Sequence, residues 1–257
     1  MDVFEQFLLL VVSIVANTFS AYAGGGAGLL QLPALIFLGL PFAVALATHK
    51  IASVALGVGA AFRHAQEKKL HWRFALFILV TGVAGVVPGA RFILTVPENI
   101  ANLALGIMTV GLAVYSWRRP EMGVHASSIH RDNTGYLVGG TILFAIGILN
   151  GSLTSGTGLF CTIWLIRWFG LDYKLAVAYT LVVVGIFWNG SGAITLALLG
   201  TVKWSWLPAL ILGSVIGGYS GAHLAIRSHN SSIKRAFELV TLITGLALIL
   251  KGASIYS

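Results

Sequence analysis

Long apolar runs separated by short polar breaks follow one another along nearly the whole chain. Each run can satisfy its backbone hydrogen bonds in lipid only as a helix, so the pattern predicts an all-α integral membrane protein. We expect ten helical segments, at residues 4–22, 25–40, 43–62, 72–94, 98–116, 135–152, 157–170, 174–199, 204–226 and 233–250. The second and seventh segments would reach only ~21–24 Å, short of the ~30 Å hydrocarbon core.

The two halves of the chain share short motifs in the same order, which indicates an internal duplication. The offset between matching motifs drifts only from 130 to 132 residues. The matches are Gly26-Ala27-Gly28 with Gly156-Thr157-Gly158, Leu38-Gly39-Leu40 with Phe169-Gly170-Leu171, Ala45-Leu46-Ala47 with Ala176-Val177-Ala178, His71-Trp72-Arg73 with Lys203-Trp204-Ser205, and 85–91 with 217–223. We therefore predict membrane repeats at residues 1–118 and 135–257, joined by a cytoplasmic linker at residues 119–134.

Each predicted repeat contains five segments, an odd number, so the second copy should enter the membrane from the opposite side as an inverted repeat. Two other layouts stay open. If the short segments did not cross the membrane, each half would have four spans and the halves would be parallel. If the first two segments of a repeat formed a re-entrant hairpin, the inversion would be kept, because parity does not separate a hairpin from two full crossings.

The distribution of basic residues gives an orientation. The chain carries a net charge of +8 with 16 Lys and Arg residues, and the inverted layout places twelve on one side and three on the other, with Lys50 buried. The richer side is predicted to be cytoplasmic, which puts both termini outside. The three are Arg91, Lys203 and Lys251, and the twelve are Arg63, Lys68, Lys69, Arg73, Arg118, Arg119, Arg131, Arg167, Lys174, Arg227, Lys234 and Arg235. The charge thus indicates membrane topology rather than nucleic-acid binding.

Other features narrow the class of protein further. The chain is 57% hydrophobic and has one cysteine, Cys161, which excludes an intramolecular disulfide and a multi-cysteine metal site. No Ser/His/Asp set, zinc spacing or Walker motif occurs, so we expect no metal, no cofactor and no enzymatic activity. The N-terminal run follows Asp2 and Glu5 rather than basic residues, so we expect a retained membrane helix and not a secretory signal.

Lys50 is the first candidate for chemistry, because it interrupts an apolar run from Ala43 to Phe62. A charged side chain at membrane depth costs at least ~2.5–3.5 kcal/mol on insertion scales, so such a residue indicates a functional site by default. We interpret it as the counter-charge of an anion, with His49 and Thr48 as neighbouring donors. The alternative is a lysine that snorkels to the nearer interface.

Two Gly-rich breaks supply the second set of candidates, because each precedes one of the short segments. Glycine lets the backbone approach a ligand, and the following helix points free N–H groups and a partial positive charge back at the break. Short, interrupted segments at matching positions of two repeats point to a transporter's site. The alternative is an ordinary tight turn with polar caps. The candidate ligands are Gly25, Gly26 and Gly28 in the first break, and Ser152, Thr154, Ser155, Gly156 and Thr157 in the second.

Further polar residues occur at related positions of the halves. Asn17 and Asn150 each precede a break, where they could face one cavity or form ordinary inter-helix hydrogen bonds. Tyr179 and Thr180 align with Thr48 and His49, whereas Leu181 replaces Lys50, so the site would carry one fixed positive charge.

Two patterns favour packing or surface roles over chemistry. The Gly85/Gly89 and Gly217/Gly221 pairs have the spacing of closely packed helices. Glu238 lies one turn from Lys234, and we expect a surface ion pair there.

These motifs resemble the TauE/SafE family of sulfite exporters, an anion-permease family, over nearly the whole chain. The resemblance rests on the first Gly-rich break followed by Leu32-Pro33 and 38–41, on Ala45-Leu46-Ala47-Thr48-His49-Lys50, on Phe62-Arg63-His64 and on His71-Trp72-Arg73. The second half departs from the family pattern at Tyr179 and in 154–158. The resemblance implies transport of sulfite, or of a related oxyanion such as a sulfonate or sulfoacetate.

We therefore expect export of a small sulfur-containing or organic oxyanion through a site at the interface of the repeats. An importer of a sulfonate-type anion, and a non-transporting intramembrane enzyme or assembly factor, are the alternatives. The oligomeric state is open, with a homodimer as one option. The lack of an evident membrane carboxylate favours transport driven by the membrane potential, with His49 tuning its pH dependence; proton coupling through His49 is the other option.

Overall fold

The fold is entirely helical in the part of the chain that the structure, a computed structural model, describes: residues 3–24, 31–32, 34–36, 38–65, 70–119, 123, 126–154 and 156–253. The α-helices are α1 Val3–Ala23, α3 Phe42–Ala65, α4 Trp72–Phe92, α5 Glu98–Trp117, α6 Asn133–Leu153, α7 Thr157–Phe169, α8 Tyr173–Tyr179, α9 Asn189–Leu199, α10 Leu207–Arg227 and α11 Asn230–Ala253. Short 3-10 turns lie at Ile93–Thr95 and Trp204–Trp206, and a π-helix, η2, spans Thr180–Trp188. The predicted all-α class is confirmed.

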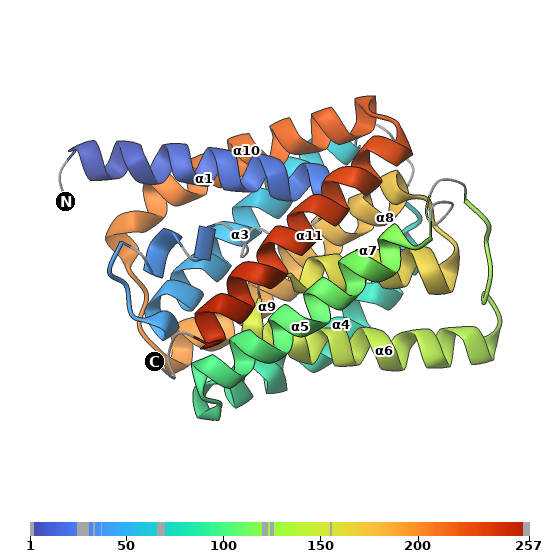
Figure 1. The fold of residues 1–257 in the computed structure, drawn as a ribbon, viewed down its shortest axis with the longest axis horizontal. Helices are drawn as coiled ribbons and strands as arrows, with labels where there is room; N and C mark the ends of the chain where they lie inside the picture. The colour runs from blue at the N-terminus through green and yellow to red at the C-terminus, as the bar shows by residue number, and fades with distance from the viewer. Residues whose placement is uncertain are drawn as a thin grey trace.

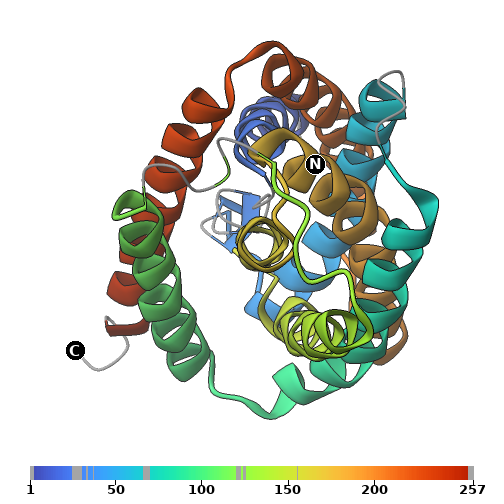
Figure 2. The ribbon, with the colours of Figure 1, turned by 90° about the vertical axis from the view of Figure 1, so that its right-hand side faces the viewer.

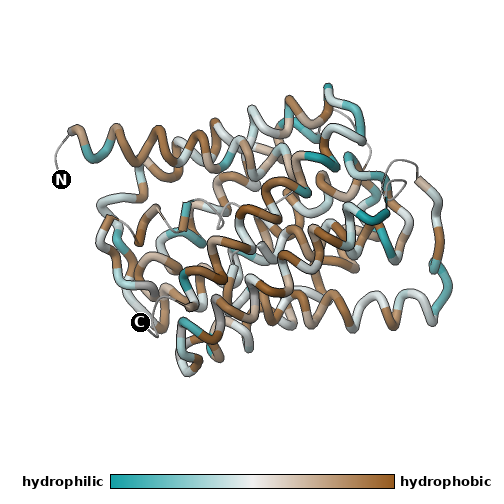
Figure 3. Tube along the Cα trace, in the orientation of Figure 1, coloured by the Kyte–Doolittle hydropathy of each residue, from teal (hydrophilic) through white to brown (hydrophobic). Residues whose placement is uncertain are grey.

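Seven helices among the described residues are long and apolar enough to cross a membrane. They are Phe4–Ala23, Ala43–His64, Trp72–Phe92, Asn133–Leu153, Tyr173–Leu199, Trp204–Arg227 and Asn230–Ala253, and shorter apolar helical stretches occupy Gly106–Trp117 and Thr157–Phe169. Figure 3 shows apolar residues along the helices and polar residues mainly at the two ends of the long axis. The protein is therefore a multi-pass membrane protein, as the sequence predicts.

The predicted segments agree with the observed helices to within a few residues. The eighth segment is a single long span in which α8, η2 and α9 follow one another without a loop. Of the second segment, residues 31–32 and 34–36 are helical, and the first Gly-rich break after Gly24 lies outside the described residues.

Helices of one half pack mainly on helices of the other. The most extensive contacts join α1 to α10, α4 to α6, and α5 to α11. In the repeat alignment α1 corresponds to α6 and α10 corresponds to α4. The contact between α1 and α10 is therefore the counterpart of the contact between α6 and α4, as expected for a duplicated unit. Figure 1 shows α1 and α6 running in opposite directions, with the start of α1 and the end of α11 at one end and the start of α6 at the other. These directions agree with the predicted inverted repeat, which stays a prediction.

The second short segment folds back beside α6 as a hairpin. Trp168 Nε1 donates to Gly135 O at 2.9 Å and Trp164 Nε1 donates to Gly139 O at 3.3 Å, so the end of α7 lies beside the beginning of α6. Most residues of α7 are buried, and Figure 2 shows this helix near the middle of the molecule, with α5 and α11 side by side along one edge.

Glycines bring the main helix pairs into backbone contact, as their spacing predicts. A Cβ added to Gly85 or Gly89 of α4 would lie 2.1 Å from a carbonyl oxygen of α6. On α10, a Cβ added to Gly217 or Gly221 would lie 2.7 and 2.3 Å from carbonyl oxygens of α1. We call these two contacts the α4–α6 seam and the α1–α10 seam.

The ion pair between Lys234 and Glu238 forms, but the expectation that it lies on the surface is wrong. Lys234 is 6% exposed, and its Nζ also donates to Ser116 O of α5 at 2.9 Å. Ser116 Oγ donates to Glu238 at 2.8 Å and lies 3.1 Å from the Tyr173 hydroxyl. The close packing of α11 on α5 buries the pair within this polar cluster.

Cysteine labelling tests the orientation. Single cysteines at Arg119 or Ser231 should react with a membrane-impermeant maleimide only from the cytoplasmic side, and cysteines at Asn99 or Thr201 only from outside. The native Cys161 is fully buried and gives a low background. Labelling of Ser231→Cys from outside would reject the inverted layout in favour of the parallel one.

Thermal unfolding in detergent tests the seams. Gly85→Ala places a methyl group 2.1 Å from Phe144 O, so it should lower stability by about 1–3 kcal/mol through overpacking. Gly111→Ala on α5 is the matched control, because no atom of the described residues outside its own helix lies within 4 Å of the added Cβ. Equal melting temperatures for the two variants would contradict the close packing of α4 on α6.

Candidate functional site

Lys50 lies in the interior of the molecule and is bound by oxygens of the second half. Its side chain is 0% exposed. Its Nζ donates to Asn150 O at 2.6 Å, to Asn150 Oδ1 at 3.0 Å and, at the longer distance of 3.4 Å, to Asn189 Oδ1. These acceptors are all neutral, and among the described residues no carboxylate pairs with this ammonium group. The lysine therefore does not snorkel to an interface in this structure.

The end of α6 provides the main acceptor. Carbonyl groups in the last turn of a helix lack intrahelical partners and carry the negative end of the helix dipole, which attracts a cation. The chain leaves the helix through Thr154, at φ 59°, and Gly156, at φ 76°. The helix ends here, and Asn150 O accepts from Lys50 and, at 3.2 Å, from the Thr154 hydroxyl.

Asn150 also ties the site to the first turn of α7 and to α9. Its Nδ2 donates to Thr157 Oγ1 at 3.0 Å and to Asn189 Oδ1 at 3.3 Å, while Thr157 Oγ1 donates to Thr154 O at 2.9 Å. The second Gly-rich break thus folds around Asn150, and its hydroxyl groups lie next to the lysine's partner.

Asn189 is positioned by the π-helix that precedes it. Wide helical turns of this kind are rare and occur frequently at functional sites. The last residue of η2, Trp188, is fully buried, and its Nε1 donates to Ile78 O of α4 at 3.2 Å. The indole lies over Gly82, where an added Cβ would be 1.7 Å from the ring. This packing fixes the start of α9 and the amide of Asn189 beside Lys50.

His49 faces a second polar cluster, formed by α1, α10 and Gln31. Its Nδ1 lies 2.7 Å from Gln31 Oε1, and its Nε2 lies 2.9 Å from the Ser53 hydroxyl. Gln31 Nε2 donates to Ser13 Oγ at 2.9 Å. All these side chains are buried, so the cluster is shielded from solvent.

Asn17 belongs to this second cluster and not to the contacts of Lys50. Its Nδ2 donates to Ser13 O at 2.7 Å and to Ser214 Oγ at 3.0 Å. Its Oδ1 is buried and has no hydrogen-bond partner among the described residues, so it keeps one free acceptor.

Comparison with known proteins agrees with this architecture. Residues 9–248 match the protein family described as sulfite exporter TauE/SafE. The chain belongs to the TauE/SafE family. It is 25% identical over 229 residues to a "Probable membrane transporter protein" of Haemophilus influenzae, with 88% of each chain covered. No solved structure matches the chain significantly.

Two further relatives carry similar descriptions. The "Probable membrane transporter protein ORF9" of a Sinorhizobium species is 25% identical over 242 residues, covering 94% of this chain and 91% of the relative. The "Probable membrane transporter protein YunE" of Bacillus subtilis is 23% identical, covering 95% and 97%. This TauE/SafE protein is therefore a membrane transporter and not an enzyme.

The three consecutive candidates on α3 contact three different parts of the TauE/SafE fold. Thr48 Oγ1 donates to Val44 O and accepts from Lys203 N at 2.9 Å, so it binds the loop before α10. His49 and Lys50 face the two polar clusters described above. Successive residues of a helix point in directions about 100° apart, and the structure assigns each direction to a different neighbour.

Tyr179 and Thr180 also diverge from the lysine. The Tyr179 hydroxyl accepts from His71 N at 2.8 Å, at the start of α4. Thr162 Oγ1 lies 2.9 Å from Thr180 Oγ1, and the Thr162 hydroxyl donates to Gly24 O at the first Gly-rich break at 2.7 Å. The pair Thr162–Thr180 has the same separation of 18 residues as Gln31–His49, so the two halves repeat one contact.

The other candidates have simple outcomes. Ser152 donates to Ile148 O at 2.9 Å within α6. Gly25, Gly26, Gly28 and Ser155 lie outside the described residues.

Several polar residues of the two clusters are not evident from the sequence as site residues. Ser13, Gln31, Ser53, Thr162 and Ser214 are isolated polar residues in apolar segments, which predicts burial but not their partners. The i, i+4 spacing of Ser13 with Asn17, and of Ser53 with His49, is a local signal that places these serines on the helix faces of candidate residues.

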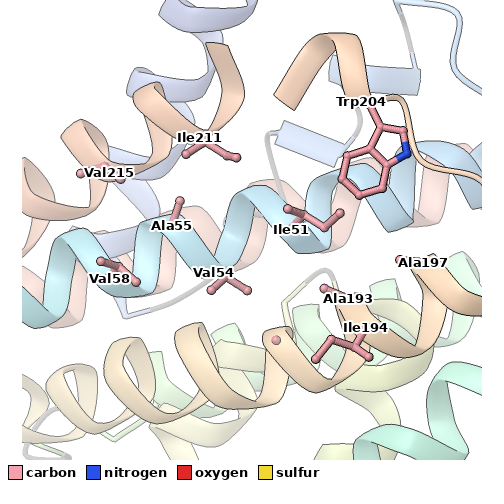
Figure 4. A pocket seen from close by; sticks show the side chains of 11 residues that line it. Ile51, Val54, Ala55, Val58, Ala193, Ile194, Ala197, Trp204, Ile211 and Val215 are labelled. Atoms are coloured by element: carbon pink, nitrogen blue, oxygen red, sulfur yellow. The ribbon is translucent and has the colours of Figure 1, made fainter. Parts of the chain in front are cut away.

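An apolar hollow of about 660 Å³ lies on the other side of α3, between α9 and α10 (Figure 4). Its walls include Ile51, Val54, Ile194, Ile211 and Trp204. Ile51 and Gly190 directly follow Lys50 and Asn189 in the chain, so the hollow and the polar site flank the same stretch of α3 and α9.

Proposed function

We propose that this TauE/SafE protein carries a small sulfur-containing or organic oxyanion across the membrane, with sulfite as the first candidate, and that the anion binds at Lys50. The observation that carries the proposal is a buried ammonium group whose partners are all neutral. Burying an unpaired charge is expensive, and an anion is the partner that offsets this cost. The family description supports sulfite and the outward direction.

The present contacts describe a closed site. All three N–H donors of Lys50 are engaged, but the bond to Asn189 Oδ1 is the longest at 3.4 Å. An oxyanion that replaces this weak acceptor would receive a charge-assisted hydrogen bond from Nζ. Asn150 Nδ2 and the hydroxyl of Thr157 are the next donors within the same cluster.

The Gly-rich breaks complete the proposed site. The second break surrounds Asn150, with Thr154 and Thr157 bonded to its backbone and side chain. The hydrogen bond from Thr162 to Gly24 O joins the start of the first break to α7. We place the anion between α3, the end of α6 and the start of α7, where the positive end of the α7 dipole lies next to Asn150.

Vesicle flux tests the function and its direction. Radiolabelled sulfite should cross the membrane of proteoliposomes that contain the purified protein, and inside-out cell vesicles should accumulate it if the protein exports. Accumulation in right-side-out vesicles instead would make the protein an importer. Protein that is folded but moves no sulfur oxyanion in any vesicle would reject the transport of this substrate class.

Substitution of Lys50 tests the site. Lys50→Ala and Lys50→Gln should lower sulfite flux at least about tenfold, because a hydrogen bond to a charged group contributes roughly 1.5–3 kcal/mol. Lys50→Arg keeps the charge in a larger, planar shape and should retain part of the flux. Full flux in the alanine variant at normal expression would remove Lys50 from the site.

Gly192 of α9 provides a finer test, because a Cβ there would lie 3.1 Å from Lys50 Nζ. Gly192→Ala should push the ammonium group away by a few tenths of an ångström and lower anion affinity several-fold. Gly190→Ala is the control on the same helix, because its nearest contact would be Val54 Cγ2 at 3.9 Å. Equal affinities for the two variants would place the anion away from the amine.

A further inference from the structure

The hydrogen bonds around His49 determine which ring nitrogen carries its proton. Ser13 Oγ donates to Leu210 O at 2.8 Å, so its lone pairs are free to accept Gln31 Nε2. The amide of Gln31 then presents Oε1 to the histidine, and the 2.7 Å contact requires a proton on His49 Nδ1. Neutral His49 therefore has its lone pair on Nε2.

The Ser53 hydroxyl suits both protonation states of Nε2. It lies 2.9 Å from His49 Nε2 and also 2.9 Å from His49 O, one turn back along α3. With neutral histidine the hydroxyl donates to Nε2. When Nε2 takes up a proton, the hydroxyl turns to His49 O and accepts from Nε2–H instead. No side chain has to move, so His49 has a partner in either state.

Among the described residues, the ionisable neighbour of His49 is Lys50, the next residue of α3. Ser13, Asn17, Gln31, Ser53 and Ser214 are neutral. The other charged or titratable residues of α3 and the elements packed on it do not hydrogen-bond to His49, Gln31 or Ser53 in the described structure. They are Arg63 and His64 on α3, Glu5 and Tyr22 on α1, Tyr173, Lys174 and Tyr179 on α8, and Tyr219, His223 and Arg227 on α10.

Charge balance connects the histidine to the anion. Two cations on consecutive residues of a buried helix repel each other with little screening even when their side chains face different clusters, so free Lys50 opposes protonation of His49. One negative charge on a bound anion neutralises Lys50. A second negative charge stays uncompensated unless the neighbouring histidine is also positive. Occupation by a dianion therefore favours protonation of His49, and by linkage a protonated His49 favours the dianion.

Building on the proposed function, we propose that His49 binds a proton at Nε2 whenever a dianion occupies the Lys50 site, so that dianions cross the membrane together with one proton and monoanions cross alone. The position of the second half that matches His49 is Thr180, which has no such group. The matching contact there joins two threonines, Thr162 and Thr180, which do not titrate in this range. The proton site thus belongs to the first half only.

Calorimetry with two sulfonates tests the proposal. Sulfoacetate carries two negative charges near neutral pH and methanesulfonate carries one. Titration of the detergent-solubilised protein in two buffers of different ionisation enthalpy gives the protons taken up per anion bound. We expect about one proton with sulfoacetate and none with methanesulfonate, and sulfoacetate affinity should fall about tenfold for each unit by which the pH rises. Equal proton uptake with both anions, or none with sulfoacetate, overturns the proposal.

Two variants assign the proton to its residue. His49→Asn keeps an N–H donor towards Gln31 but does not titrate, so it should weaken sulfoacetate binding at least tenfold more than methanesulfonate binding, with no proton uptake. Thr81→Val on α4 is the control, because the Thr81 hydroxyl bonds Phe77 O and Ile78 O of its own helix at 2.7 and 3.2 Å, and its proton count should equal that of the wild type. Proton uptake by His49→Asn on sulfoacetate binding, or an equal loss of affinity for sulfoacetate and methanesulfonate, contradicts the assignment.

Transport separates this proposal from the function on which it rests. With the potential clamped by potassium and valinomycin, wild-type proteoliposomes holding a trapped pH dye should acidify inside when sulfoacetate is added and show no change with methanesulfonate. Movement of both radiolabelled anions without acidification rejects the proton site alone. Failure of the wild-type protein to bind or move either anion or sulfite rejects the proposed function as well.

Discussion

The ammonium group of Lys50, enclosed between the two halves of the chain, is the constraint on which the central part of the molecule depends. A charge at this depth needs acceptor oxygens around it. In apolar helices these come from the free carbonyl groups at a helix end or from the side-chain amides of Asn and Gln. The end of α6 at Asn150 supplies a carbonyl and an amide, and the π-helix brings Asn189 to the opposite side. Gly192 leaves the space that the amine occupies.

The two halves repeat the same contact between helices but differ in the charged and titratable residues at the matching positions. The pair Gln31–His49 in one half corresponds to Thr162–Thr180 in the other, at the same separation of 18 residues. Lys50 is matched by Leu181, and the acceptor of Asn17 stays without a partner among the described residues while that of Asn150 binds the lysine. The position of the contact is therefore repeated, whereas the lysine and the histidine of the site both come from the first half.

The sequence predicts the features that depend on local pattern. Apolar runs determine the helices, glycine spacing determines the seams, and Lys50 is conspicuous because its surroundings are uniformly apolar. The partners of His49 depend instead on how α1, α10 and Gln31 meet in space, which no local pattern encodes. The burial of Lys234 depends likewise on the packing of α11 against α5, and the π-helix at Thr180–Trp188 has no composition that distinguishes it from an ordinary apolar helix.

The two glycine seams restrict how this molecule can move. Along the α4–α6 and α1–α10 seams, backbone lies directly against backbone, with carbonyl oxygens where side chains would otherwise stand. Helices in such contact have no layer of flexible side chains between them that could adjust to sliding or rotation. We therefore expect each pair, which takes one helix from each half, to move as one rigid body. Lys50 is on α3 and Asn150 is on α6, outside both seams, and the Lys50 side chain joins the two helices through the carbonyl and the amide oxygen of Asn150. A movement that separates α3 from the end of α6 would break these hydrogen bonds while both seams stay intact, so anion binding and opening would act on the same few atoms.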